Sequence, residues 1–395
     1  MKPIAIIGSG LAGYTVAREF RKLDKTTPLL IITGDDGGFY SKPMLSNAFA
    51  MGKQPQQLQS KTADQMAAEL TATILTKTLV SGINTVAHTI HTKMGDFEYA
   101  QLVLAPGAQA IRLPIAGSAA DQVLSVNNLT DYAVFRDKLA QAGDKARVTI
   151  LGAGLIGCEF SDDLASAGHE VTLIDPNTLP LAALAPTAIS QGLHAALNAK
   201  GVQLKLGTTA SQIDMLDNTL QVTLSNGESF NTDVVLSAVG LRADIRLAQA
   251  AQLHTDRGII INEYGQTSVP EIFALGDCAQ YKQADGSQSL MPYVAPIMTA
   301  ARAIALSLTG QLTSIDMKPA AVLVKTPSYP VALIPPAFAA SKSGRWESGH
   351  AEGVTTSRYF DESNNLHGFA VAPQDAKSRN ALIAELIEAQ ATRLN

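Results

Sequence analysis

Residues 3–13 have the sequence PIAIIGSGLAG, and this stretch decides the fold. Pro3–Ile7 is an apolar run that predicts a buried strand, and the glycines at 8, 10 and 13 follow it in the spacing GxGxxG. Tyr14–Leu23 then has its apolar residues at helical spacing, and Leu29–Ile32 is a second strand-like run. Strand, glycine turn, helix and strand form a βαβ unit, in which the strands are parallel and the crossover is right-handed.

The same pattern returns in the middle of the chain. Arg147–Leu151 predicts a strand, residues 152–157 read GAGLIG, Cys158–Ala167 predicts a helix that ends at Gly168, and Val171–Ile174 predicts the next strand. A single GxGxxG could be an ordinary glycine turn. Two of them, each between a strand and a helix, favour two nucleotide-binding units, because such a turn lets the backbone approach a pyrophosphate at a helix N-terminus.

Composition and charge exclude several classes of protein. The chain has 395 residues, a net charge of −5 and 46% apolar residues, which fits two or three globular domains. The acidic balance gives no support for nucleic-acid binding, and no apolar run is long enough to span a membrane. We recognise no signal peptide and no Cys-x-x-Cys pair, so we expect a cytoplasmic protein. Residues 1–110 carry ten basic and eight acidic side chains. This small surplus of basic charge either attracts an acidic partner or has no functional meaning.

An acidic residue is expected about 20 positions after the glycine turn, where its carboxylate binds a ribose. In the second unit Asp175 lies eighteen positions after Gly157, and no Arg or Lys follows it directly, so NADH is favoured over NADPH. A solvated aspartate at a strand end is the alternative. In the first unit Thr33 occupies the strand end and Asp35 comes slightly late, so that a plain loop acid is equally compatible.

A third feature is TSVPEIFALGDCA at 267–279, an apolar strand that ends in Gly276-Asp277. With the two glycine units, it makes the chain resemble flavoprotein reductases with two dinucleotide-binding domains, which include glutathione reductase, ferredoxin reductases and apoptosis-inducing-factor-like enzymes. The resemblance implies FAD on the first unit, NAD(P)H on the second, and Asp277 on the ribityl chain of FAD. Ala105-Pro106-Gly107 departs from the Ala-Thr-Gly usual in this group, which loses a hydroxyl but retains the turn.

Three further stretches resemble bacterial rubredoxin reductases, namely FYSKPMLS at 39–46, LGAGLIGCEF at 151–160 and VLVKTP at 322–327. This resemblance implies electron transfer from NADH, the substrate, through tightly bound FAD to rubredoxin, an acidic electron carrier, one electron at a time, in the service of an alkane hydroxylase. It also implies an α/β fold with two Rossmann-like domains, as in glutathione reductase, and a small C-terminal α+β domain. We expect the FAD-binding domain at 1–110 and 245–315, the NADH-binding domain at 111–244 and the C-terminal domain at 316–395.

The cysteines separate the possible acceptors. Disulfide reductases of this fold place a cysteine pair beside the flavin, whereas Cys158 and Cys278 have no such partner and are interpreted as small buried residues. Without a dithiol, electrons would leave the flavin directly, which suits a one-electron carrier protein. NADH oxidases and peroxide reductases are disfavoured, because they use a redox cysteine near position 42, where this chain has Ser41 and Lys42. A ferredoxin reductase of an oxygenase system and an NADH-sensing flavoprotein stay open as alternatives.

Three residues are candidates for catalytic roles. Lys42 would stabilise negative charge on the reduced flavin and could pair with Glu159, which matches an acid near the nicotinamide in ferredoxin-reductase-like relatives. Lys325 interrupts an apolar strand and would lie near the flavin. The alternative for Lys42 is a surface lysine, and the alternative for Glu159 is an acid stabilised by a helix N-terminus. The alternative for Lys325 is a lysine on the solvent-exposed face of an edge strand.

The predicted cofactor-binding set comes mainly from the matched motifs. Its members are Gly8, Gly10, Leu11, Ala12, Gly13, Thr33, Asp35, Lys42, Pro43, Ala105, Gly107, Gly152, Gly154, Leu155, Ile156, Gly157, Glu159, Asp175, Gly240, Gly276, Asp277, Val294 and Lys325. We expect no metal site, because the histidines lack ligand spacing beyond the weak pair His88 and His91. The oligomeric state stays open between a monomer and a weak homodimer.

Overall fold

The computed structural model describes residues 1–282, 286–336 and 343–394, which form two compact units. The first unit comprises Met1–Lys42, Gln56–Gln109 and Leu241–Lys318. The second comprises Pro43–Pro55, Ala110–Gly240 and Pro319–Asn395. Each unit contains a five-stranded parallel sheet, and in each sheet one strand is followed directly by one of the two glycine turns.

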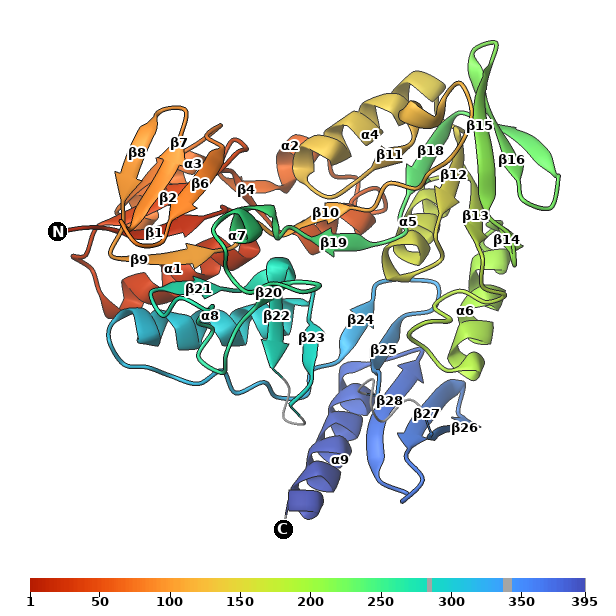
Figure 1. Cartoon of the computed structure of the whole chain (residues 1–395). Helices are drawn as coiled ribbons and strands as arrows, with labels where there is room; N and C mark the ends of the chain where they lie inside the picture. The colour runs from red at the N-terminus through yellow and green to blue at the C-terminus, as the bar shows by residue number, and fades with distance from the viewer. Residues whose placement is uncertain (283–285, 337–342, 395) are drawn as a thin grey trace. The chain divides into compact units, whose positions relative to one another are not determined.

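The centre of the first unit is the parallel sheet β21-β9-β1-β2-β5 (Figure 1). Its strands are β1 (Ile4–Ile7), β2 (Leu29–Ile32), β5 (Ala72–Leu75), β9 (Gln101–Leu104) and β21 (Ile272–Ala274). Every residue of β1, β2 and β21 is buried, because elements cover both faces of the sheet.

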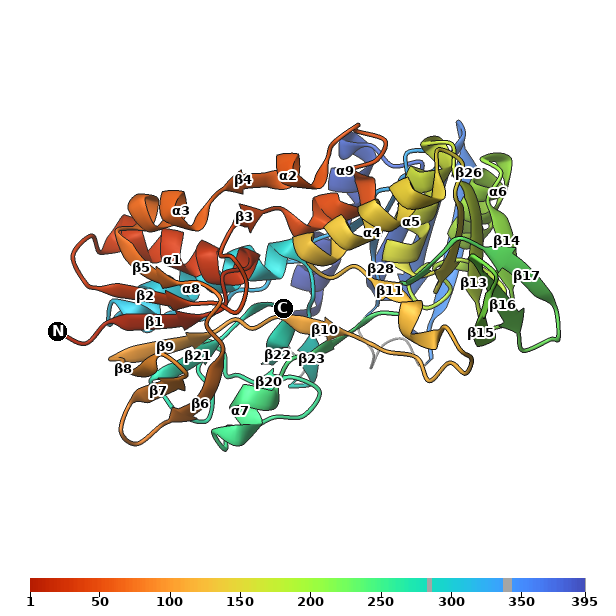
Figure 2. The ribbon, with the colours of Figure 1, turned by 90° about the horizontal axis from the view of Figure 1, so that it is seen from above.

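Helices cover one face of this sheet, and a smaller antiparallel sheet covers the other (Figures 1 and 2). On the first face, α1 (Leu11–Leu23) packs against α8 (Val294–Leu308). The smaller sheet consists of β6 (Val80–Asn84), β7 (Thr89–Thr92) and β8 (Gly95–Glu98). Further elements of this unit are β3 (Phe39–Tyr40), β4 (Gln59–Lys61), α3 (Ala63–Leu70), β19 (Leu241–Ala243), α7 (Arg246–Ala250), β20 (Ile259–Ile260), η3 (Gly276–Cys278), β22 (Ala279–Lys282) and β23 (Gln288–Leu290), while α2 (Pro55–Leu58) and β10 (Ala108–Ala110) lie at its boundaries.

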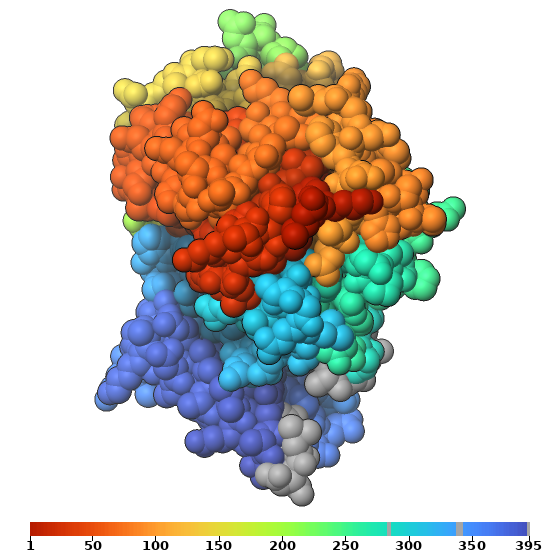
Figure 3. Space-filling view, turned by 90° about the vertical axis from the view of Figure 1, so that its left-hand side faces the viewer, coloured from red at the N-terminus to blue at the C-terminus, as the bar shows by residue number. Residues whose placement is uncertain are grey.

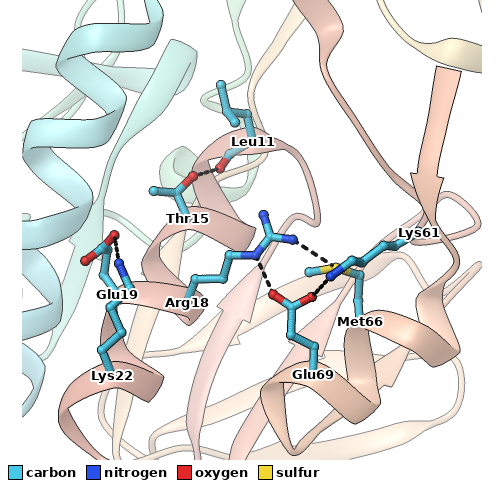
Figure 4. Close-up of polar contacts among 8 residues, drawn as sticks. All are labelled: Leu11, Thr15, Arg18, Glu19, Lys22, Lys61, Met66 and Glu69. Carbon is cyan, nitrogen blue, oxygen red and sulfur yellow. Dashed lines mark hydrogen bonds and ion pairs between the residues drawn. The ribbon is translucent and has the colours of Figure 1, made fainter.

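Polar contacts tie α1 to α3 (Figure 4). The Arg18 Nε atom donates to Glu69 Oε1 at 2.8 Å, and Lys61 on β4 pairs with the other oxygen of Glu69. Arg18 Nη2 also lies 3.4 Å from Met66 Sδ. On the molecular surface the red N-terminal residues run between the orange part of this unit and the cyan residues of α8 (Figure 3). The polar contacts of Arg18 hold α1, the helix that follows the first glycine turn, against α3.

The second unit has its own parallel sheet, in the order β11-β18-β12-β13-β14. The strands are β11 (Leu124–Ser125), β12 (Arg147–Leu151), β13 (Glu170–Asp175), β14 (Gln203–Leu206) and β18 (Val234–Ser237). The helices with them are α4 (Leu129–Ala142), α5 (Leu155–Ser166) and α6 (Thr187–Ala199). An antiparallel sheet of β15 (Ala210–Leu216), β16 (Thr219–Leu224) and β17 (Ser229–Thr232) is inserted before β18.

The C-terminal residues form an antiparallel sheet in the order β24-β25-β28-β27-β26. Its strands are β24 (Val322–Val324), β25 (Val331–Ile334), β26 (Arg345–Ala351), β27 (Val354–Phe360) and β28 (Leu366–Ala372). The final helix α9 (Ala376–Leu394) packs on β28 through a small core that includes Phe369, Val371, Leu382 and Leu386. The sheet also contacts α5 through β24 and α6 through β27 and β28.

The predicted α/β fold is confirmed. The two predicted βαβ units are β1-α1-β2 and β12-α5-β13, and both strand pairs are parallel. Sequence analysis assigned no structure to the residues of α4, α6 and the β15–β17 sheet, because these lie outside the motifs. Lys325 was expected inside a strand, but β24 ends at Val324, so that Lys325 lies in the turn that follows.

Candidate functional site

The first glycine turn has the geometry that a bound pyrophosphate requires. Gly8 has a φ of +109°, and a Cβ at Gly13 would lie 1.9 Å from the Gly8 carbonyl oxygen. A Cβ at Gly10 would meet nothing within 4 Å, and Gly10 caps α1 without a side-chain hydrogen bond. Two glycines are therefore required by packing, and the third leaves open space in front of the helix N-terminus that Leu11 and Ala12 begin.

The acid of the first unit is held by the residues around it. Asp35 Oδ1 accepts from Thr33 Oγ1 at 2.6 Å and from the Gly37 N–H at 2.9 Å, and it lies 3.1 Å from Ser9 Oγ. Ser9 belongs to the glycine turn, so these contacts place the Asp35 carboxylate beside that turn. Thr33 occupies the strand end, as the sequence indicates, and it orients the late acid.

The Gly276-Asp277 segment also lies against the start of α1. Gly276 has a φ of +82°, and a Cβ there would lie 2.9 Å from the Ala12 Cβ. The Gly276 N–H donates to the buried Tyr281 hydroxyl at 2.9 Å. Lys42 Nζ lies 3.7 Å from Asp277 Oδ2. The structure thus pairs Lys42 with Asp277, whereas the sequence suggested Glu159 as its partner.

Three more predicted residues belong to the first unit. Ala105 is buried beside the first turn, because its carbonyl oxygen lies where a Gly8 Cβ would stand. Gly107 has a φ of +78°, and the turn after β9 therefore has the left-handed conformation that glycine favours. Val294 is the first residue of α8, and 44% of its surface is exposed.

The second glycine turn repeats the first with a more regular acid. A Cβ at Gly157 would lie 1.8 Å from the Gly152 carbonyl oxygen, and one at Gly154 would meet nothing within 4 Å. Asp175 Oδ2 accepts from the Ala153 N–H at 2.7 Å, and its Oδ1 accepts from the Asn177 N–H and Nδ2, both at 2.8 Å. The carboxylate is therefore fixed beside the turn, as a ribose-binding acid would be.

Three other predicted residues surround this turn. Leu155 and Ile156 form the first turn of α5, and 42% of the Ile156 surface is exposed. Gly240 has a φ of +108° and follows β18, the strand that lies beside β12. These positions line the start of α5 and leave apolar surface accessible there.

The second unit also contains an ion pair between Glu159 on α5 and Lys325. Glu159 is fully buried, and its Oε2 lies 2.5 Å from Lys325 Nζ. Glu159 Oε1 accepts the Lys325 backbone N–H at 2.8 Å, and Ser46 Oγ donates to Oε2. Both oxygens of Glu159 are thus occupied by residues of its own unit. Glu159 thus pairs with Lys325, a partner that the sequence did not suggest.

The Lys325 ammonium is enclosed by oxygen acceptors. Besides Glu159, it lies within hydrogen-bond distance of the Pro43 carbonyl oxygen at 2.7 Å, Asn47 Oδ1 at 2.9 Å and Ser46 Oγ at 3.1 Å. An ammonium has three protons, so these acceptors are enough to take all of its hydrogen bonds. Sequence analysis gave no role to Ser46 and Asn47. Their only signal was their position three and four residues after Pro43, at the end of the stretch that carried the resemblance.

Both cysteines are buried and free. Burial raises the pKa of the Cys158 thiol, and it raises that of Cys278 to about 12. The prediction that they are small buried packing residues is confirmed, and a thiol of this kind is a poor nucleophile at neutral pH. Among the described residues, no group of three or more His, Cys, Asp or Glu side chains is arranged to hold a metal ion.

Comparison with known proteins agrees with this geometry. Residues 2–303 match the family described as pyridine nucleotide-disulphide oxidoreductase, and residues 314–386 match a rubredoxin binding C-terminal domain. The chain belongs to the pyridine nucleotide-disulphide oxidoreductase family. The family resemblance stated from the sequence is thereby confirmed.

Several members of this family are similar to the chain over nearly their whole length. A rubredoxin-NAD(+) reductase of Acinetobacter baylyi is 41% identical over 400 residues, which cover 99% of this chain and 100% of that protein. The rubredoxin-NAD(+) reductase of Alcanivorax borkumensis is 41% identical over 388 residues, which cover 98% of this chain and 99% of that protein. A nitric oxide reductase FlRd-NAD(+) reductase of Aeromonas hydrophila is 36% identical, covering 98% of this chain and 96% of that protein.

Solved structures of the family share the fold. Putidaredoxin reductase, in its covalent complex with putidaredoxin, superimposes with a TM-score of 0.88 at 24% identity, covering 98% of this chain and 93% of that one. The ferredoxin reductase for the CYP199A2 system of Rhodopseudomonas palustris gives a TM-score of 0.84 at 25% identity, covering 94% and 91%. None of the helices in the described part of the chain is long and apolar enough to cross a membrane.

Proposed function

We propose that the chain is an FAD-dependent NADH:rubredoxin reductase. The observation that carries this proposal is the combination, in one chain, of two open glycine turns with a segment that matches a rubredoxin-binding domain. We assign the FAD-binding domain to 1–110 and 245–315, the NADH-binding domain to 111–244 and the C-terminal domain to 316–395. FAD, when bound, accepts a hydride from NADH and releases the electrons singly.

The residues of the first unit fit FAD. The open space at Gly10 admits a pyrophosphate to the N-terminus of α1, where free N–H groups and the helix dipole favour it. The Asp35 carboxylate, oriented by Thr33, would accept hydrogen bonds from the adenosine ribose. Asp277 would hold the ribityl chain, and Lys42, 3.7 Å from it, would stabilise negative charge on the reduced flavin.

The residues of the second unit fit NADH. Gly154 offers the same open space at the start of α5, and the fixed Asp175 carboxylate would bind the adenosine ribose and repel a 2′-phosphate. We assign the Glu159–Lys325 pair to the nicotinamide, where its role would be positioning and electrostatic stabilisation. Hydride transfer itself needs no acid or base.

Electrons would leave the flavin without passing through a thiol. The family is named for disulphide chemistry, yet both cysteines of this chain are buried and unpaired. A direct one-electron transfer to a small carrier is the exit that this arrangement permits. We propose rubredoxin as that carrier and an alkane hydroxylase as the final user of the electrons.

The test is NADH oxidation by the purified protein with rubredoxin and with a ferredoxin, compared side by side. Rapid turnover with rubredoxin and little with the ferredoxin is expected. Faster turnover with the ferredoxin would favour the ferredoxin reductase alternative. Reduced flavin that accumulates and is not reoxidised by either carrier would favour an NADH sensor.

A further inference from the structure

Helix α5 carries more buried charge than the proposed function explains. Glu159, Asp162 and Asp163 are each exposed by 1% or less. Their spacing places them on neighbouring positions of one helix surface. Burying a carboxylate costs free energy, and like charges close together add to that cost. Asp162 and Asp163 make no ion pair within the described part of the chain, so hydrogen bonds compensate their charge.

The hydrogen bonds of Asp162 reach the turn after β24. Asp162 Oδ2 accepts from the Ser328 backbone N–H at 2.9 Å and from Ser328 Oγ at 2.7 Å. Ser328 comes three residues after Lys325, in the same turn. Asp162 therefore holds the turn from which the Lys325 side chain extends.

The hydrogen bonds of Asp163 reach the segment Pro43–Pro55. Asp163 Oδ1 accepts from the Ala50 N–H at 2.8 Å, and Oδ2 accepts from the Phe49 N–H at 3.0 Å. These donors lie two and three residues after Asn47, which, like Ser46, lies within hydrogen-bond distance of the Lys325 ammonium. Asp163 therefore holds the segment that supplies acceptors to the Lys325 ammonium, and Asp162 holds the turn that carries Lys325.

Arg136 on α4 strengthens the same anchorage. Its guanidinium lies 3.7 Å from the centre of the Phe49 ring and donates to the Lys53 carbonyl oxygen at 2.8 Å. The Phe49 ring also meets His169, Tyr132 and Phe135 edge to face. The segment is thus fixed by packing on one side and by the Asp163 carboxylate on its backbone.

We propose that Asp162 and Asp163 are positioning residues, which set the place of the Lys325 ammonium by holding the two segments that meet there. This inference rests on the proposed function only for the consequence that NADH reduces the flavin more slowly when the ammonium is displaced. The anchorage itself is a property of the second unit alone. Burial of these two carboxylates costs stability, and the anchorage is the reason that we infer for their presence on α5.

The hydrogen bonds of the anchorage depend on the ionisation of Asp163. Burial raises the pKa of Asp163 to about 6, and the groups that face it are Asp162 on α5, and Arg136 and Tyr132 on α4, with His169 across the Phe49 ring. Above that pH both oxygens accept backbone N–H groups. Below it one oxygen carries a proton and accepts less well. The hydrogen bonds that hold the segment therefore change as the pH passes through about 6.

The experiment compares Asp162→Asn and Asp163→Asn with the holoenzyme. Asp214→Asn is the matched control, because Asp214 also accepts a backbone N–H, from Ser118 at 2.8 Å, and shares no contact with Lys325. One readout is hydrogen exchange at the amides of Phe49, Ala50 and Ser328. The other readout is the rate at which NADH reduces the bound flavin, measured from pH 5 to 8 and separately from the rate of reoxidation by rubredoxin.

We expect Asp163→Asn to speed exchange at Phe49 and Ala50 by about tenfold, the equivalent of one charge-assisted hydrogen bond. Flavin reduction should slow by a similar factor and lose its break near pH 6, while reoxidation stays unchanged. Asp162→Asn should act in the same way at Ser328, and Asp214→Asn should change none of these rates.

Unchanged exchange in both variants would overturn the anchorage, and faster exchange with an unchanged rate of flavin reduction would overturn the positioning role. If the unaltered protein fails to react with NADH, the proposed function fails, but the exchange result still decides the anchorage. Should either Asn variant fail to fold, Ser328→Ala removes one hydrogen bond to Asp162 and leaves the backbone contact. In that variant, exchange and reduction rates both equal to those of the unaltered protein would contradict the proposal.

Discussion

The two glycine turns are nearly identical in their backbone and differ in the acid that accompanies them. In each turn the third glycine touches the carbonyl oxygen of the first, and the middle glycine opens onto free space. In the second unit Asp175 ends its strand and accepts directly from the turn, through Ala153. In the first unit the strand end is Thr33, and Asp35 reaches the turn through Thr33 and Ser9.

This difference shows which part of a nucleotide site packing dictates. The first and third glycines leave no room for a side chain, so that any chain with this turn must keep them. The acid has no such constraint, because a carboxylate can reach the same place from the strand end or, with help from a hydroxyl, from the loop beyond. The glycines should therefore govern stability, and the acids should govern which ligand binds.

The largest effect is expected where a side chain has no space. Gly157→Ala places a methyl group 1.8 Å from the Gly152 carbonyl oxygen, and the backbone has to move. We expect a loss of about 4 kcal/mol in the free energy of unfolding, at the upper end of overpacking effects. Chemical denaturation measures it.

The matched control is Gly154→Ala, whose methyl group meets nothing within 4 Å. It should leave the free energy of unfolding within about 1 kcal/mol of the original, the ordinary cost of a tolerated substitution, and weaken NADH binding instead. Equal stability of the two variants would contradict the division between packing and ligand binding.

The next effect concerns the ion pair of the second unit. Lys325→Met leaves the fully buried Glu159 without its cation, and an uncompensated buried charge costs about 3 kcal/mol of stability. The comparison is Lys205→Met, which breaks the exposed pair with Glu228 and should cost less than about 1 kcal/mol. Thermal unfolding at pH 7 distinguishes them, and similar losses would mean that the Glu159 site is not closed to solvent.

A smaller effect separates the two acids. Asp175→Ala should lower the preference for NADH over NADPH by about tenfold, as expected for a lost hydrogen bond to a charged group, and leave the FAD content unchanged. Asp35→Ala should have the opposite pattern, a lower FAD content with the same nucleotide preference. Steady-state kinetics with both nucleotides and the flavin-to-protein ratio measure these outcomes. If either substitution changes both properties, the assignment of one acid to each cofactor is wrong.

The last effect is on the pH dependence of stability. The pKa of Asp163 in the folded protein, about 6, lies above its ordinary value of 3.8, so the folded state binds this proton more tightly than the unfolded state. Its contribution to stability is present below pH 3.8 and is lost as the pH rises to about 6. Asp163→Asn should remove this decline, and unfolding measured at several pH values between 4 and 7 tests it. A variant that keeps the same decline would show that another group causes it.

Much of this architecture was predictable, because its signals are local. The glycine turns, their strands and the Asp175 position follow from spacing within about 30 residues, the length of one βαβ unit. The burial of Cys158 and Cys278 also follows from local position, because Cys158 comes directly after the second glycine turn and Cys278 directly after Gly276-Asp277.

The surroundings of Lys325 were not predictable, because its partners come from two distant parts of the sequence. Glu159 contacts Lys325 from α5, and Ser46 and Pro43 contact it from the segment Pro43–Pro55. No spacing rule connects such residues, so the sequence did not suggest Lys325 as the partner of Glu159. The buried acids Asp162 and Asp163 had one signal, their place beside Glu159 on a helix of mainly apolar and small residues, and it was overlooked.

The central claim is that this chain binds FAD and passes electrons from NADH to rubredoxin without a thiol. Anaerobic mixing of the purified protein with NADH, followed by oxidised rubredoxin, tests it most directly. The account predicts a yellow protein that bleaches with NADH, regains its colour as rubredoxin is reduced, and does so equally well when Cys158 and Cys278 are both replaced by Ala. A protein that binds no flavin, or a reduced flavin that rubredoxin cannot reoxidise, would contradict it.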